Sequence, residues 1–165
     1  MGQAETMIAA LLLLAAQTSA PPCDLGSVQT ARATHDALSR RAAKVVEWAS
    51  ADDRRMSAFV DPSARFDLGA GDVGRPLGQG VAGARALAAS MKADQFRFLG
   101  WDYMDRPADA CSKQSITVEF IDTADRLVSR VEFAFDRGRV IEAKGWQHSF
   151  EGGSLPSMRR GGNGS

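Results

Sequence analysis

The spacing of apolar residues changes once along this chain, and that change restricts the folds available to it. Up to Ala49, a stripe recurs at steps of three and four, formed by Val28, Ala31, His35, Leu38, Ala42, Val45 and Ala49. Such spacing is typical of one long helix with a buried face. After Lys92 the period is two, which is typical of strands with one buried face. The sequence therefore predicts helices first and a sheet after them.

Two shorter helices are predicted after the long one. Residues 50–53 (SADD) supply capping side chains for a short helix that carries Met56, Phe59 and Val60 and ends at Asp61-Pro62. Another helix carries Val81, Ala84, Leu87, Ala88 and Met91. Between these helices, Ala64–Leu68 is a brief strand candidate. Residues 69–80, which contain five glycines and one proline, are predicted to form a loop.

Four strands are predicted in the second half of the chain, at residues 96–104, 115–122, 127–135 and 139–150. Within them Ile116, Val118 and Phe120 share one face, and Val131, Phe133 and Phe135 alternate with polar residues in the same way. One apolar face per strand predicts an antiparallel sheet covered on one side. The fold class is therefore α+β, with a curved antiparallel sheet wrapped around two or three N-terminal helices.

The two ends of the chain are expected to lie outside the folded domain. Residues 8–16 are an uncharged apolar run followed by small residues at 18–20 and by Pro21-Pro22, so residues 1–20 are predicted to be a signal peptide. The preceding residues carry Glu5 and no Lys or Arg, and Met1 and Met7 are both candidate starts of the chain. Residues 21–27 form a linker that contains Cys23. Residues 151–165, with five glycines, are predicted to be a disordered tail.

Charge and cysteine content exclude several classes of function. Twenty basic and twenty acidic residues give a formal charge of zero, which removes the electrostatic case for nucleic-acid binding. No apolar stretch is long enough for stable membrane insertion. The only two cysteines, Cys23 and Cys111, are 88 positions apart and make one possible disulfide in an exported protein. Lipidation of Cys23 is disfavoured because residues 20–22 lack the expected small and leucine positions.

The arrangement of helices and strands resembles the nuclear-transport-factor-2-like superfamily, which includes ketosteroid isomerases and SnoaL-like polyketide cyclases. The resemblance covers about residues 28–150, and those residues are taken as one domain. It is carried by residues 48–53 (WASADD), 59–67 (FVDPSARFD), Gly80 and 133–141 (FAFDRGRVI). The resemblance implies a cystatin-like cone whose wide end holds an apolar pocket, and it does not imply an activity.

The catalytic positions that the resemblance implies are mostly not retained. The isomerase tyrosine falls near Lys44, its general-base aspartate at or next to Asp67, and its second acid near Val131. The water-positioning Arg-x-Asp of the epoxide hydrolases of this fold falls on residues 117–119 (TVE), which lack the arginine. Residues 130–132 (RVE) have a similar pattern one strand later. Asp67 is therefore the main catalytic candidate, with His35 and His148 as assisting groups.

Several aromatic and charged residues are candidates for a pocket or an interface. They are Trp48, Phe66, Trp101, Tyr103, Glu119 and Trp146. Trp101 and Tyr103, together with Glu119 and Arg130, would also suit a homodimer joined through the outer face of the sheet. With two histidines far apart and no Cys/His cluster, neither a metal nor another cofactor is expected.

Three functions remain open from the sequence. The first is an exported periplasmic or secreted domain that binds an apolar small molecule without catalysis or serves as an interaction module. The second is a SnoaL-like isomerase, cyclase or hydrolase acting on an uncharged cyclic substrate with Asp67 as general base. The third is a structural homodimer without a pocket.

Overall fold

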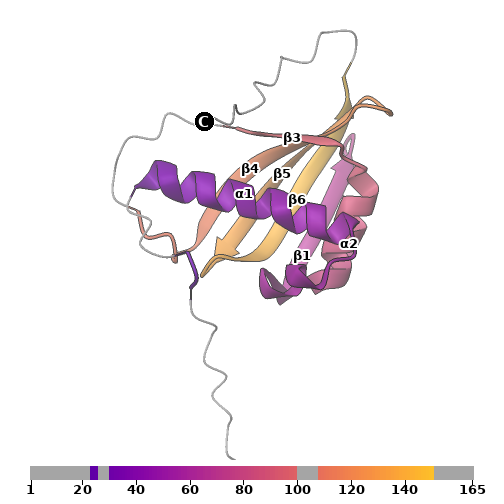
Figure 1. Ribbon diagram of the computed structural model, residues 1–165. Coiled ribbons are helices and arrows are strands. Elements are labelled where there is room, and N and C mark those ends of the chain that lie inside the picture. Colours follow the sequence, from indigo (N-terminus) through magenta and orange to yellow (C-terminus); the bar gives the residue numbers. More distant parts are fainter. Residues whose placement is uncertain (1–22, 26–29, 100–107, 151–165) are drawn as a thin grey trace, which may run out of the picture.

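Two helices cover one face of a six-stranded sheet in the computed structural model, which describes residues 23–25, 30–99 and 108–150 (Figure 1). Helix α1 spans Ala31–Ser50, the 3-10 helix η1 spans Arg54–Ala58 and helix α2 spans Gly80–Met91. The strands are β1 (Val60–Ala70), β2 (Pro76–Gln79), β3 (Gln95–Phe98), β4 (Gln114–Asp122), β5 (Leu127–Asp136) and β6 (Arg139–Ser149). The α+β prediction is confirmed.

The strands lie in the order β2-β1-β6-β5-β4-β3. Neighbouring strands are antiparallel except for β1 and β6, which are parallel. The sheet is therefore mixed, whereas the sequence predicted antiparallel pairing throughout. The parallel pair arises from the path of the chain. Strands β3 to β6 form a meander that starts at the sheet edge far from β1, and its last strand, β6, lies beside β1 and runs in the same direction. Pairing between strands so far apart in the chain leaves no local sequence signal.

The segment predicted as a loop, residues 69–80, contains strand β2. It pairs with β1 at Arg65↔Gln79 and Phe66↔Gly78, and its proline is tolerated because β2 is an edge strand. Strand β1 is also longer than predicted. It starts at Val60, which was predicted to belong to the preceding helix, and its pairing with β6 is interrupted between Val60 and Arg65, around Pro62. A proline can be accommodated there because no ladder hydrogen bond is required of it.

Strands β4, β5 and β6 agree with their predicted ranges to within about one residue. Strand β3 is described to Phe98, and the rest of its predicted range falls mostly on residues 100–107, outside the described residues. The predicted signal peptide (1–20) and tail (151–165) also lie outside them and stay predictions.

Side chains from both layers fill the space between the helices and the sheet. The largest of them are at most 1% exposed, and they include Leu38, Met56, Phe66, Leu87, Met91, Phe133 and Phe135. Helix α1 contributes the predicted stripe, with Leu38, Ala42, Val45 and Ala49 buried. The rings of Phe120 and Phe133 lie 6.1 Å apart, within the range of favourable aromatic pairs. The inner face of the sheet is thus a packed core.

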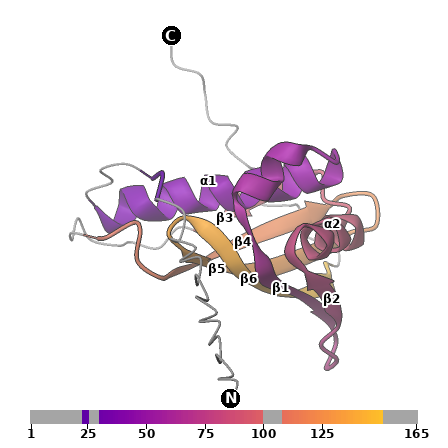
Figure 2. The ribbon, with the colours of Figure 1, turned by 90° about the horizontal axis from the view of Figure 1, so that it is seen from below.

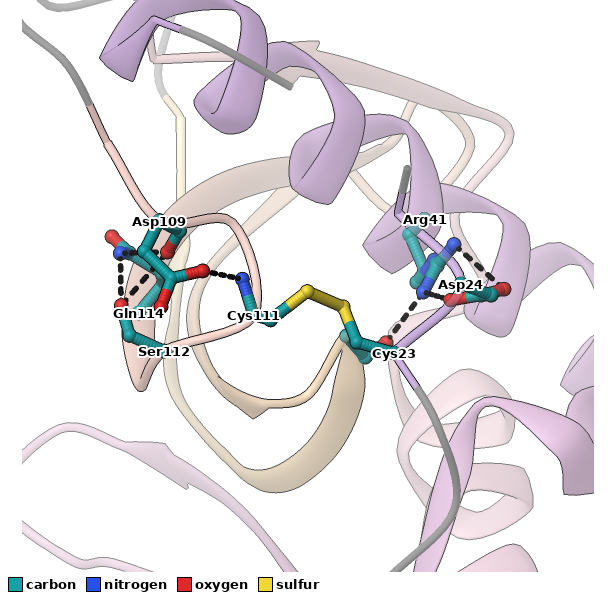
Figure 3. Close-up of a disulfide and its surroundings, with 8 residues drawn as sticks. Cys23, Asp24, Arg41, Asp109, Cys111, Ser112 and Gln114 are labelled. Atoms are coloured by element: carbon teal, nitrogen blue, oxygen red, sulfur yellow. Dashed lines mark hydrogen bonds and ion pairs between the residues drawn. A yellow bond between two sulfur atoms is a disulfide. The ribbon is translucent and has the colours of Figure 1, made fainter. Parts of the chain in front are cut away.

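A disulfide joins Cys23 to Cys111, with the two Cα atoms 5.8 Å apart, as the sequence allowed (Figure 3). The segment beside it is also held by Arg41 of α1, which donates to the carboxylate of Asp24 at 2.7 Å and to the carbonyl of Gly138 at 2.8 Å (Figure 3). The N–H of Arg137 donates to the carbonyl of Cys111 at 3.1 Å. Residues 23–25 are thereby fastened to α1, to the loop before β4 and to the β5–β6 turn.

Candidate binding groove on the outer face of the sheet

Strand β1 divides its side chains between the two faces of the sheet. Ala64, Phe66 and Leu68 are buried in the core beneath the helices. Because successive side chains point to opposite faces, Arg65, Asp67 and Gly69 lie on the outer face, away from the helices. The parallel pairing with β6 places Glu142 beside Arg65, Lys144 beside Asp67 and Trp146 beside Gly69.

These residues line a cavity of about 590 Å³, which we call the outer groove. Its other lining residues include Gly74, Pro76, Gly78 and Gln79 of the β1–β2 hairpin. Figure 2 shows this hairpin extending away from α1 at one edge of the sheet. The volume lies within the range of small-molecule sites in proteins.

Trp146 lies against the backbone of Gly69 and presents an aromatic surface to the groove. A Cβ atom at position 69 would lie 2.3 Å from Cζ3 of Trp146 and 2.7 Å from the carbonyl oxygen of Val73. Only glycine therefore lets the indole approach β1 this closely. Trp146 is 41% exposed, and among the residues that the structure describes it is one of three large apolar side chains left exposed. The groove thus contains an aromatic surface held in place by a backbone contact.

The charged side chains of the groove are balanced. Nη2 of Arg65 and Oε1 of Glu142 are 2.9 Å apart, and these side chains are 67% and 40% exposed. An ion pair this exposed contributes little to stability, so a ligand can replace it at low cost. Asp67 is half-buried and Lys144 exposed, and they are register partners on the same face. Two acids and two bases leave the groove with no formal charge.

A second polar cluster continues the outer face toward β3. The carboxylate of Glu119 is only 5% exposed and pairs with Arg97, and its Oε1 lies 3.3 Å from Nη2 of Arg130. A buried carboxylate needs such partners because desolvation of an unpaired charge is costly. The sequence named Glu119 and Arg130 only as residues that would suit a dimer face, and it predicted neither their ion pair nor the contribution of Arg97. Cross-strand pairing places Arg97, Glu119, Arg130, Trp146 and Gly69 in one row.

The predicted catalytic residues are not brought together. His35 is on α1, which covers the inner face, and its Nδ1 lies 3.5 Å from the hydroxyl of Ser39. Asp67 is on the outer face. His148 shares that face but is four residues beyond Lys144, or roughly 13 Å along the strand from the partner of Asp67. None of the three is placed to form a base–orienter pair with another.

The other two positions implied by the resemblance, Lys44 and Val131, do not line the groove. Lys44 is exposed and pairs with Glu47 at 2.8 Å, whereas Val131 is fully buried in the core. Phe66 is a core residue, 1% exposed. Trp48 packs on Phe59, with ring centroids 5.4 Å apart. Trp101 and Tyr103 lie outside the described residues.

A smaller cavity of about 320 Å³ lies between α1 and the β3–β4 edge. Its lining includes Val46, Glu47, Asp94, Phe96 and Phe120. Phe96 is 45% exposed. This cavity contains none of the residues predicted to be catalytic.

In residues 23–25, 30–99 and 108–150, no three His, Cys, Asp or Glu side chains are grouped to hold a metal ion. No helix within the same ranges is long and apolar enough to cross a membrane.

The chain is similar to known proteins in its fold and not in its sequence. No protein-family model and no curated protein sequence matches the chain. Among solved structures, a candidate isomerase from Rhodopseudomonas palustris is 11% identical, with a TM-score of 0.44, 67% of this chain covered and 89% of that one. A cystatin-like protein of unknown function from Methylobium petroleophilum is 17% identical, with a TM-score of 0.43 and coverage of 78% and 84%. An NTF-2-like protein of unknown function from Burkholderia xenovorans is 15% identical, with a TM-score of 0.41 and coverage of 76% and 93%.

Proposed function

We propose that this protein is an exported, non-catalytic binding domain whose binding surface is the outer groove. The observation that carries the proposal is the separation of the two faces of the sheet. The inner face is filled by core side chains such as Phe66 and Phe133, each at most 1% exposed. The outer face holds the 590 Å³ cavity with Trp146 and four charged side chains.

Catalysis is disfavoured by the same separation. A general base acts with a positioned partner within hydrogen-bond reach or through one water. Asp67 and His35 are on opposite faces, and His148 is displaced along β6. The SnoaL-like alternative, with Asp67 as general base, therefore has less support than binding. The outer groove also differs from the apolar pocket expected from the sequence, because charged side chains line it.

Export is supported by the disulfide. Cystines persist in oxidising compartments and are rare in reducing ones. The bond between Cys23 and Cys111 begins three residues after the proposed signal-peptide cut at Ala20. We therefore place the mature chain, from residue 21, in the periplasm or outside the cell. The intact mass of the secreted protein tests this, and retention of residues 1–20 in soluble protein whose cysteines are reduced would contradict it.

The sequence also predicts that two copies of the chain form a homodimer through the outer face of the sheet, and this stays a prediction. The ion pairs of Glu119 with Arg97 and Arg130 on β3–β5 offer a polar surface for it. Sedimentation of the full chain as one species of twice the monomer mass would support it.

The binding proposal can be tested without knowing the ligand. A library of small fragments is added to ¹⁵N-labelled oxidised protein, and chemical-shift changes are mapped by NMR. We expect hits to move the amide signals of Gly69, Gly78 and Lys144 together with one indole signal. Hits that cluster instead at the cavity beside Phe96 would overturn the assignment of the groove.

A further inference from the structure

We propose that the outer groove binds a neutral saccharide, with one sugar ring against the exposed part of Trp146. This inference rests on the proposed function and adds the chemical class of the ligand.

The aromatic surface requires a ligand with an apolar face. Trp146 is 41% exposed and lines the cavity, while its six-membered ring is held against Gly69. A large aromatic side chain with one side on protein and another facing a cavity gains most from a partner that covers it. The C–H face of a sugar ring is such a partner, and it leaves the hydroxyl groups of the ring free to point outward.

The charges around Trp146 disfavour ligands that are wholly cationic, wholly anionic or wholly apolar. Arg65 and Lys144 oppose a cation, and Asp67 and Glu142 oppose an anion. A wholly apolar ligand would remove all four charges from water without replacing their hydrogen bonds, which is costly. Polyanionic nucleic acid is disfavoured because neither the groove nor the chain carries a net positive charge.

The hydrogen-bonding groups match hydroxyls on every side. Arg65 and Lys144 are donors only, the carboxylates of Asp67 and Glu142 are acceptors, and the amide of Gln79 is both. A hydroxyl donates and accepts at the same atom, so successive hydroxyls can use alternating acids and bases. The exposed Arg65–Glu142 pair at 2.9 Å can open to admit them. The cavity of about 590 Å³ is sufficient for more than one ring.

The test is titration calorimetry of the full oxidised chain with neutral oligosaccharides, namely cellohexaose, maltohexaose, hexa-N-acetylchitohexaose and mannohexaose. We expect at least one to bind. Trp146→Ala should weaken that binding about tenfold or more, because it removes the central aromatic contact. Asp67→Asn, which keeps the shape but removes the negative charge, should weaken it by about threefold to tenfold. Phe96→Ala removes an aromatic residue of similar exposure from the other face and should leave binding unchanged.

Each other outcome overturns the saccharide assignment. Binding that survives Trp146→Ala places the sugar elsewhere, and binding of adenosine but no oligosaccharide assigns the groove to a flat heterocycle. A dimer in solution that Trp146→Ala dissociates assigns the groove to a second copy of the chain. If fragments map to the groove but no oligosaccharide binds, the saccharide class is wrong while the proposed binding function stands.

Discussion

The disulfide between Cys23 and Cys111 is predicted to carry a large part of the stability of this domain. Replacing both cysteines with serine opens a covalent loop of 88 residues. In the chain-entropy model, that loop corresponds to about 4.6 kcal/mol of unfolding free energy at 25 °C. For a folded region of this size, such a loss lowers the melting temperature by roughly 15 °C.

The measurement is urea unfolding of the oxidised wild type and of the double serine variant, each with and without reductant. We expect reductant to destabilise the wild type by about as much as the double substitution does, and to leave the variant unchanged. Arg41→Gln, which removes the noncovalent bonds to Asp24 and Gly138 but keeps the disulfide, should cost less, about 1–2 kcal/mol. A difference in unfolding free energy below about 1 kcal/mol between the oxidised wild type and the double variant would refute this prediction, since the chain-entropy model requires a difference of several kcal/mol.

Three further results are expected. Gly69→Ala should displace Trp146 and lower the free energy of unfolding, measured by thermal denaturation, by about 1–3 kcal/mol. Gly74→Ala, where a Cβ meets nothing within 4 Å, should be near neutral, and equal effects of the two substitutions would argue against the Trp146–Gly69 contact. Glu119→Gln should cost about 1.5–3 kcal/mol, because it weakens the charge-assisted contacts of a buried carboxylate with Arg97 and Arg130. Glu142→Gln, in the exposed pair with Arg65, should cost about 0.5 kcal/mol or less, and the reverse order would be inconsistent with the burial of Glu119. The side-chain hydroxyl and backbone N–H of Ser63 donate to Asp61 and lower the pKa of its carboxyl group. The stability that this gives is present above the ordinary carboxyl pKa and is lost as the pH falls through the lowered pKa. Ser63→Ala should therefore be less stable than wild type at neutral pH and closer to it in acid, and a difference in unfolding free energy that is independent of pH would contradict this.

The layers of the fold could be predicted from the sequence because they depend on local periodicity. The stripe through Leu38 and Val45 and the alternation through Val131 and Phe133 record burial directly. Strand β2 could not be predicted, since glycine and proline at positions 76–78 indicate a loop and only pairing with β1 makes the segment a strand. The parallel contact between β1 and β6 is a consequence of tertiary topology, and local pattern does not record it.

The candidate site was only partly predictable. Asp67 and Trp146 were identified from their residue types, and both line the groove. Their orientation was not known, because a residue's face depends on register, and register was unknown for β1. Gly69 and Lys144 were missed for the same reason. A search for outward-facing partners on β1 and β6 requires the knowledge that these two strands are neighbours.

The central claim is that ligands bind to the outer face of the sheet, at Trp146, and not inside the cone. The most direct measurement is the NMR fragment screen repeated on wild type, Trp146→Ala and Phe96→Ala. We expect Trp146→Ala to abolish most hits and Phe96→Ala to retain them. Hits that persist in Trp146→Ala and disappear in Phe96→Ala would contradict it, because they would place the binding site beneath α1 on the inner face.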